Sequence, residues 1–264
     1  MSSLAWSQDT GFCPVPFFPN IFNYWQQNPI PVEFIKVEKQ DYKRNKNASF
    51  CTRPIEMVDT IVFHHSETPS TSTPEYINQL HLNRGTKDDP WYMIAYSFVI
   101  NAPYKGATIP KQVVTEGRPL EIVGAHAGSN AFVPMDDEQQ RLWAEGKVAC
   151  GKEGEDFKVD PTLVKNGKIK ANVTTLGVVV NGNYAPFSKH NPNGYRRGAS
   201  RGPTTETKTM LAQLSCQLQK QYPRIKNLRP HNSYHSTTCP GDLWTPANVA
   251  EVKKIAKGLG CEFN

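Results

Sequence analysis

Two short stretches of the chain carry side chains that could bind a metal ion. The first is "IVFHHSE" at residues 61–67, where two histidines end an apolar run. The second is "RPHNSYHSTTCPGDLW" at residues 229–244, which holds His231, His235 and Cys239 at intervals of four. Imidazole nitrogens and a thiolate are common zinc ligands in proteins. A histidine from the first stretch and a His–Cys pair from the second would make a three-ligand set.

Only one of the two adjacent histidines can face such a site. The segment "VDTIVFHH" at residues 58–65 is β-branched and bounded by turn formers, which predicts a strand. Successive side chains on a strand point to opposite faces, so His64 and His65 cannot both reach the same point. A lone strand-end histidine is more often structural than a ligand, so its partners must come from elsewhere in the chain.

The second stretch predicts a loop. On a helix, intervals of four would place the three side chains on one face, but Pro230 and the Pro240–Gly241 pair favour irregular structure. From spacing alone, a metal site and a disulfide-bonded or buried Cys239 are equally open. Catalytic zinc commonly takes three protein ligands and leaves one position for water. A structural four-ligand site would need His235 as well.

The remaining pattern predicts the elements that must hold these side chains. Expected strands lie at residues 58–65, 94–101, 111–117 and 175–184, and expected helices at 73–85, 204–223 and 245–260. Their alternation predicts an α/β fold: a single domain, residues 55–264, with a central mixed β-sheet flanked by helices. Residues 133–170 are expected to form a surface insertion with a short helix. Residues 1–54 are expected to form an N-terminal extension that packs on the domain.

Composition narrows the classes of partner. The chain has 264 residues and a formal net charge of +6, which suits an anionic polymer or surface. Its densest basic cluster, "YRRGASRG" at residues 195–202, has no aromatic platform, so no nucleic acid partner is expected. The apolar runs are too short for a transmembrane segment. The N-terminus does not resemble a signal peptide, so either the protein is cytosolic or a leader was removed.

Several motifs together resemble a known family. "IVFHHS", "IAYSFVIN", "VTEGRP", "VGAHAGSNAF", "TLGVVVNGNY" and a histidine eight residues before "CPG" occur in this order. The chain thereby resembles the zinc N-acetylmuramoyl-L-alanine amidases, the group that includes T7-lysozyme-type and AmpD-like amidases and the peptidoglycan recognition proteins. The likeness runs from about residue 58 to residue 259, interrupted by residues 133–170.

The resemblance implies a role for particular residues. The zinc ligands correspond to His64, His231 and Cys239, with one zinc ion per chain. Tyr96 and Thr237 match catalytic positions, where they would assist the attacking water or the developing oxyanion. His126 and Asn130, in "GAHAGSN", match positions that line the cleft or hold its loop, which suggests substrate binding.

One position departs from the AmpD-like pattern. Asn181 stands where those enzymes have a glutamate, so a carboxylate general base is not expected there. Other charged or polar side chains are expected to be structural. His65 should pack on the opposite face of its strand, His81 and His190 should be solvated, and Glu116 and Arg118 should be turn and ion-pair residues.

The function implied by the resemblance is hydrolysis of the amide between N-acetylmuramic acid and L-alanine by a zinc-activated water. The alternatives are a non-catalytic module that binds peptidoglycan or muropeptides, and an interaction protein with structural zinc. Because peptidoglycan lies outside the membrane, a periplasmic or secreted location and a missing leader are expected. We expect a monomer.

The six cysteines contain no CxxC pair, which argues against a zinc ribbon or a dense disulfide scaffold. With Cys239 assigned to zinc, five remain, so at most two disulfides can form and one thiol is left over. Cys216 and Cys261, on or after the two C-terminal helices, are the first predicted pair.

Overall fold

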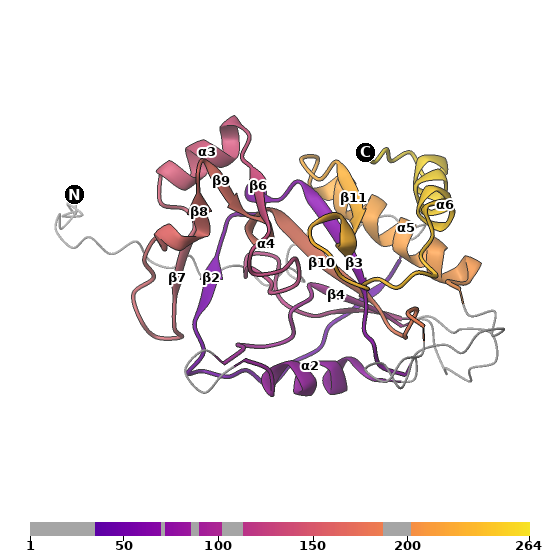
Figure 1. Ribbon diagram of the computed structural model, residues 1–264, viewed down its shortest axis with the longest axis horizontal. Coiled ribbons are helices and arrows are strands. Elements are labelled where there is room, and N and C mark those ends of the chain that lie inside the picture. Colours follow the sequence, from indigo (N-terminus) through magenta and orange to yellow (C-terminus); the bar gives the residue numbers. More distant parts are fainter. Residues whose placement is uncertain (1–34, 70–71, 86–89, 102–112, 187–201) are drawn as a thin grey trace, which may run out of the picture.

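The computed structural model describes residues 35–69, 72–85, 90–101, 113–186 and 202–264, and its centre is a six-stranded sheet (Figure 1). In spatial order the strands are β1 (Val37–Glu38), β5 (Val113–Glu116), β4 (Phe98–Asn101), β10 (Thr175–Val180), β3 (Thr60–His65) and β11 (Asn227–Pro230). Strands β4 and β5 pair antiparallel, and the other neighbours pair parallel. The predicted α/β architecture with a central mixed sheet is therefore confirmed.

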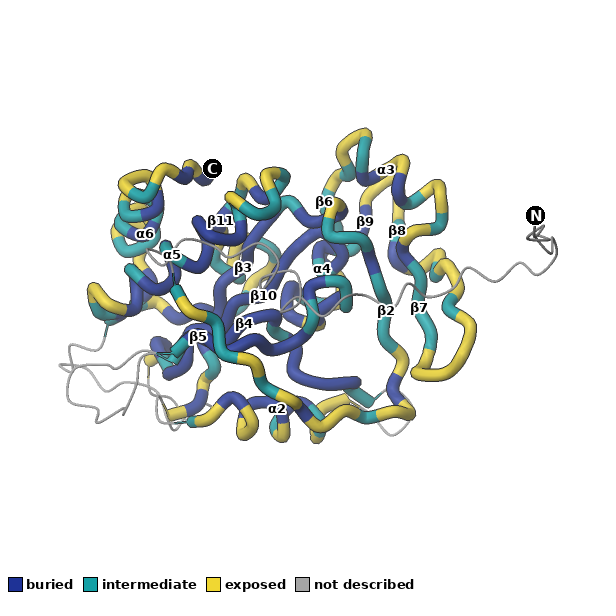
Figure 2. Tube along the Cα trace, turned by 180° about the vertical axis from the view of Figure 1, so that it is seen from behind, coloured by how far each residue is buried: buried dark blue, intermediate teal, exposed yellow. Residues whose placement is uncertain are grey.

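Helices cover both faces of this sheet. Helices α5 (Thr205–Gln221) and α6 (Pro246–Gly258) pack together, and α2 (Pro74–Leu82) lies away from them (Figure 1). Every residue of β3 and β10 is buried, which appears as the dark centre of Figure 2. Strands buried on both faces have continuous apolar runs rather than alternation, as "TIVF" and "LGVVV" do.

The helix boundaries follow from their N-caps. Thr73, Thr204 and Thr245 each accept a hydrogen bond from a backbone N–H in the first turn of α2, α5 and α6. These hydrogen bonds satisfy N–H groups that have no partner inside the helix. The three predicted helices are confirmed. The predicted disulfide between Cys216 and Cys261 is also confirmed, and it ties α5 to the segment after α6.

Residues 133–170 form a small subdomain that includes a second sheet. Its elements are β6 (Phe132–Pro134), α3 (Asp137–Ala144), β7 (Ala149–Gly151), η2 (Pro161–Leu163), β8 (Val164–Lys165) and β9 (Lys168–Lys170). The predicted short helix is confirmed, and a capping box between Asp136 and Gln139 begins it. Leu142 and Ile169 pack in an apolar cluster with Met57 of η1 (Ile55–Met57). The segment therefore shares a buried apolar cluster with neighbouring parts of the chain, including Met57, Val123 and Val173.

A second disulfide joins this subdomain to the chain before the main sheet. Cys51 lies on β2 (Phe50–Thr52), which pairs antiparallel with β7, and it bonds to Cys150. Strand β1 adds to the edge of the main sheet beside β5. Residues 35–54 thus contribute β1 to the six-stranded sheet and β2 to a separate two-stranded sheet with β7. Cys13 and His190 lie outside the described residues.

Three expectations about residues 81–118 are corrected. His81 is not solvated: it is 5% exposed, and its Nδ1 accepts a hydrogen bond from the backbone N–H of Ala95. The strand expected at residues 94–101 begins only at residue 98. Arg118, expected in an ion pair, instead donates to the carbonyl oxygens of Met93, Ile94 and Val123, which holds the chain before β4 in an irregular path.

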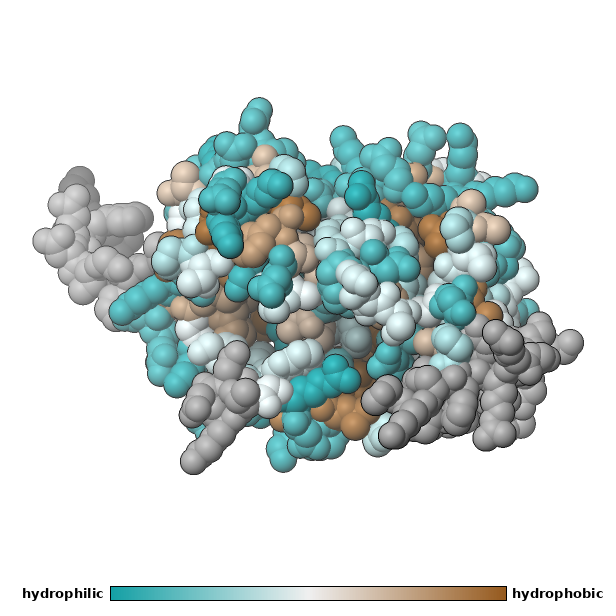
Figure 3. Space-filling model, viewed as in Figure 1, coloured by the Kyte–Doolittle hydropathy of each residue, from teal (hydrophilic) through white to brown (hydrophobic). Residues whose placement is uncertain are grey.

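The face shown in Figure 3 is largely hydrophilic, with apolar colour in separate areas. Among the described residues, no helix has both the length and the apolar character needed to cross a membrane.

Candidate metal centre

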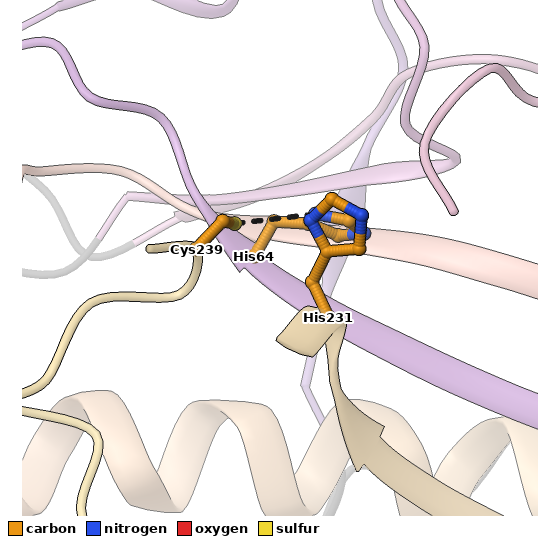
Figure 4. Close-up of side chains that lie close together, drawn as sticks. All are labelled: His64, His231 and Cys239. Carbon is orange, nitrogen blue, oxygen red and sulfur yellow. Dashed lines mark hydrogen bonds between the residues drawn. The ribbon is translucent and has the colours of Figure 1, made fainter. Parts of the chain in front are cut away.

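Three potential metal ligands converge from separate parts of the chain (Figure 4). His64 is the fifth residue of β3, His231 begins η3 (His231–Ser233) directly after β11, and Cys239 lies in the loop before α6. Their ligand atoms all lie within 4.8 Å of one another, and within the described part of the chain this is the one such group of histidine, cysteine and carboxylate side chains.

The parallel register of β3 and β11 brings the two histidines together. Pro230 pairs with Phe63 across the two strands, so the residues that follow, His231 and His64, come to lie side by side. Their ring centroids are 4.3 Å apart. Two residues far apart in sequence are thus placed by backbone hydrogen bonds of the sheet.

The loop that carries Cys239 packs against Tyr184, in the segment that follows β10. Gly241 has φ +94°, and a Cβ atom there would lie 2.3 Å from the carbonyl carbon of Tyr184. Only glycine allows this close approach, and the N–H of Leu243 donates to the Tyr184 carbonyl at 3.3 Å. The loop consequently presents the Cys239 Sγ 3.4 Å from the His64 Nδ1.

Burial keeps the three groups neutral in the absence of metal. It lowers the pKa of His64 far below its usual range and that of His231 to about 4, and it raises the pKa of the Cys239 thiol to about 12. Neutral imidazole is the form that binds a metal ion, and a thiol gives up its proton when it does so. A bound cation would stabilise the buried thiolate of Cys239 and so favour loss of the thiol proton.

One ring nitrogen of His231 lacks a hydrogen-bond partner, which indicates that a ligand binds there. The Nδ1 of His231 is buried and has no hydrogen-bond partner. Buried polar atoms are almost always paired, and an exception calls for an explanation such as an ion. Two neutral imidazoles and one thiol are a donor set that suits zinc, which is usually four-coordinate. The residues present therefore fit a zinc ion with one position left for water.

Tyr96 and Thr237, the residues matched to catalytic positions, lie beside this group. The ring centroid of Tyr96 is 5.0 Å from that of His64, and burial raises the pKa of the phenol above its usual value. The phenol therefore stays protonated near pH 7 and can donate. The Thr237 Oγ1 accepts from the backbone N–H of Cys239 at 3.2 Å, which leaves its own hydrogen free to donate elsewhere.

His126 and Asn130, matched to substrate positions, differ in exposure. Asn130 is exposed on the loop before β6, and a contact with substrate there stays a prediction. His126 is only 4% exposed, and its Nδ1 lies 3.2 Å from the His64 Nε2. Asn172 holds its backbone, accepting from the His126 N–H at 2.9 Å. The His126 ring thus contacts the ligand His64, and the bond to Asn172 fixes the backbone that carries this ring.

Two polar residues next to the group have partners of their own. The Nδ1 of His65 accepts from the backbone N–H of Tyr184 at 3.2 Å, and His65 is not part of the three-residue group. The Asn181 amide donates to Asn101 Oδ1 at 2.8 Å and accepts from Ser66 Oγ at 2.8 Å. Asn181 therefore fastens the loop after β3 to the ends of β4 and β10.

His235 has a contact that the sequence did not reveal. Its Nε2 lies 2.9 Å from the Nε2 of His231. The sequence suggested His235 only as a fourth ligand, because spacing within a loop does not give the direction of a side chain. The structure places it next to a ligand histidine, with the ring centroids of His231 and His235 4.6 Å apart.

Comparisons with known proteins give similarities at low identity. No family model matches the chain, and no curated protein matches it. Among solved structures, the endolysin N-acetylmuramoyl-L-alanine amidase LysCS from Clostridium intestinale URNW is 20% identical, with a TM-score of 0.49, covering 86% of this chain and 97% of that one.

Two further solved structures have similar coverage. The Ph2119 endolysin from a Thermus scotoductus bacteriophage is 16% identical, with a TM-score of 0.42 and coverage of 84% and 99%. Drosophila PGRP-LB is 18% identical, with a TM-score of 0.45 and coverage of 81% and 95%. The structural neighbours are thus amidases and peptidoglycan recognition proteins, the group that the motifs resemble.

Proposed function

We propose that the protein is a zinc-dependent N-acetylmuramoyl-L-alanine amidase that cleaves peptidoglycan or its fragments. The observation that carries this proposal is the convergence of His64, His231 and Cys239, together with a buried His231 Nδ1 that has no hydrogen-bond partner. The choice of substrate is supported by the order of the sequence motifs and by the net charge of +6, which suits an anionic wall polymer. In this proposal residues 55–264 form the catalytic domain.

When bound, zinc would lower the pKa of a water molecule towards about 7 and polarise the scissile carbonyl. The chain's own residues would supply orientation and hydrogen bonds. Tyr96, protonated at neutral pH, would donate to the oxyanion that develops on the carbonyl oxygen. The Thr237 hydroxyl, anchored on the Cys239 N–H, would donate a second hydrogen bond to it. No carboxylate is available at Asn181 to take the water's proton.

Location outside the cytoplasm follows from the substrate and is supported by the disulfides. Bonds such as Cys51–Cys150 and Cys216–Cys261 persist in oxidising compartments and are rare in the cytosol. We therefore propose a periplasmic or secreted enzyme.

The test is digestion of defined cell walls. Purified protein loaded with zinc should release stem peptides that begin with L-alanine from sacculi or soluble muropeptides, identified by mass spectrometry. Substrates with diaminopimelate and with lysine stems should both be tried. Metal analysis should give about one zinc per chain, and a chelator should stop the release.

The matched variant is Cys239→Ala, which removes one ligand without adding bulk. Its zinc content and its cleavage should both fall to background. Full cleavage by this variant, or cleavage of a different bond, would contradict the proposal. A protein that keeps zinc and binds muropeptides but cuts none of the walls would instead be a recognition module.

A further inference from the structure

Each of the two ligand histidines has its Nε2 next to a ring nitrogen of a second histidine. The His64 Nε2 meets the His126 Nδ1 at 3.2 Å, and the His231 Nε2 meets the His235 Nε2 at 2.9 Å. A neutral imidazole has one N–H and one lone pair, so the partner of one nitrogen decides the state of the other. The hydrogen bonds further out settle both cases.

The buried pair is decided by Thr175. Its Oγ1 donates its only hydrogen to the Ala171 carbonyl at 2.7 Å, so towards the His126 Nε2, 3.3 Å away, it can only accept. The Thr175 carbonyl, 3.4 Å from the same nitrogen, also accepts only. The hydrogen of His126 is therefore on Nε2, and its Nδ1 accepts from the His64 Nε2–H. This leaves a lone pair on the His64 Nδ1, which faces the Cys239 Sγ.

The exposed pair is decided by a backbone carbonyl. The His235 Nδ1 lies 3.2 Å from the carbonyl oxygen of Ser236, which can only accept, so this nitrogen carries the hydrogen. The His235 Nε2 then has the lone pair and accepts from the His231 Nε2–H. The lone pair of His231 is left on Nδ1, the buried nitrogen that lacks a partner. Both chains of hydrogen bonds end with a lone pair on Nδ1 of the ligand.

Glycines make room for both outer histidines. A Cβ at Gly177, on β10, would lie 2.7 Å from the His126 Cγ, and one at Gly124 would lie 2.7 Å from its Cδ2. A Cβ at Gly128 would lie 2.7 Å from the His235 Cδ2. The His126 ring thus rests directly on the sheet, and the His235 ring rests on the loop that follows His126. A side chain at any of these glycines would occupy space that the histidine ring now fills.

We propose that His126 and His235 are positioning residues that hold His64 and His231 in the tautomer with hydrogen on Nε2, so that both Nδ1 lone pairs face the metal. This inference rests on the proposed metal site. It assigns His126 a task different from substrate contact, and it assigns His235 a task as a hydrogen-bond partner of a ligand instead of a fourth ligand. Partners of this kind fix the ring orientation and raise the basicity of the ligand nitrogen.

The direct test reads the tautomers in the zinc-free protein. Long-range ¹H–¹⁵N correlation spectra of histidine-labelled protein distinguish Nε2–H from Nδ1–H rings. His64, His126 and His231 are each expected as the Nε2–H form, and His235 as the Nδ1–H form. Hydrogen on Nδ1 of either ligand histidine would overturn the proposal without any use of zinc or substrate.

The second test compares variants of equal shape that differ in the accepting atom. His126→Asn keeps an oxygen where Nδ1 was, whereas His126→Leu removes it. His235→Gln keeps an oxygen where Nε2 was, whereas His235→Met removes it. Zinc affinity, measured by competition with a chelating dye, should fall about 10- to 100-fold in His126→Leu and up to about 10-fold in His235→Met, since water can partly replace an exposed partner. The amide variants should recover most of it.

Matched controls separate positioning from general loss of stability. Gln139→Leu removes a fully buried hydrogen bond to the Met57 carbonyl, and Asn232→Ala shortens an exposed side chain on the same short helix as His231. Neither should change zinc affinity. If His126→Leu does not fold, the His235 pair and the wild-type tautomers decide the question.

The outcomes for this inference and for the proposed function are distinct. Wild-type protein that binds no zinc would overturn the proposed metal site. Wild-type protein that binds zinc, together with apolar variants that bind it equally tightly, would overturn only the positioning role. A Co²⁺-substituted protein gives a further reading, because its visible absorption should change in His126→Leu and return in His126→Asn if ligand orientation is what the partner controls.

Discussion

The two ligand histidines reach the same point from unlike surroundings. His64 lies within a central strand, is 1% exposed, and is backed by His126, which is also buried. His231 lies on a short 3-10 helix at the edge of the sheet and is backed by His235, which is exposed. The order of groups is the same in both halves: a backbone carbonyl, an outer histidine, the ligand Nε2, and a ligand Nδ1 that carries the lone pair.

The two ligand histidines are therefore held in position by different parts of the structure. The half carried by the sheet, with His64, His126 and Thr175, is part of the packed interior, so its geometry and the stability of the fold depend on the same contacts. The half carried by the loop, with His231 and His235, can be altered without opening the core. We expect changes in the first half to affect both folding and zinc, and changes in the second to affect zinc alone.

The largest effect is expected from removing a ligand. His64→Ala and His231→Ala should each reduce cleavage by about 10³-fold or more, because the zinc-activated water is lost. Their zinc-free stabilities should differ. His64→Ala leaves a cavity and strips the His126 Nδ1 of its donor, costing about 2–3 kcal/mol, whereas His231→Ala should cost less than about 1 kcal/mol. Urea unfolding of the metal-free proteins measures the difference.

The neighbouring histidine supplies the control for this comparison. His65→Asn keeps an oxygen in the place of the Nδ1 that accepts from the Tyr184 N–H. It should retain zinc and most of the activity. Equal losses of stability in the two ligand variants would refute the distinction between the halves.

A smaller effect is expected from the glycines that seat the outer histidines. Gly177→Ala puts a methyl group 2.7 Å from the His126 ring on a buried strand, which should cost about 3 kcal/mol and weaken zinc binding about 10-fold by displacing the ring. Gly128→Ala puts one equally close to the exposed His235 ring, which can move away.

In Gly128→Ala the main cost comes from φ +86°, which an alanine adopts only with strain, about 1 kcal/mol. Zinc affinity should change less than 3-fold. Thermal unfolding and dye competition on the same samples test both statements. A Gly128→Ala protein with the larger loss of zinc affinity would reverse the assignment of the rigid half.

Local sequence signals were sufficient for the helices and for showing that only one of the two adjacent histidines can face the site, whereas the family resemblance selected His64. The Thr73–Pro74 pair marks the start of α2, and the leucine spacing predicts α5. Strand alternation shows that His64 and His65 cannot face the same site. The pairing of His64 with His231 and Cys239 required the family resemblance. The reason is physical: the register of β3 against β11 joins segments more than 160 residues apart, and no local pattern encodes it.

Three features could not be predicted from the sequence, because each depends on contacts between side chains and backbone that are far apart in the chain. The irregular path before β4 is imposed by Arg118, which lies beyond that strand in the chain. The outer histidines depend on Thr175 and on Gly177, neither of which stands out in a strand pattern. His81 was expected in solvent, yet it is buried and accepts a hydrogen bond from the Ala95 N–H.

His81 also offers the smallest and last test, because it is a buried histidine that belongs to neither half of the metal centre. Burial, followed by the charges of Arg84 and Arg118, lowers its pKa from 6.5 to about 3. The unfolded chain therefore takes up a proton below pH 6.5 that the folded protein does not, and the stability contributed by the neutral ring is lost as the pH falls towards 3.

His81→Asn keeps an oxygen for the Ala95 N–H but cannot titrate. Between pH 7 and pH 5 the zinc-free variant should lose about 1–2 kcal/mol less stability than the wild type, while its zinc affinity at pH 7 stays unchanged. A fall in zinc affinity as large as that expected for His126→Leu would mean that replacing any buried histidine near the sheet weakens zinc binding. The hydrogen bond to His64 would then no longer explain the role of His126.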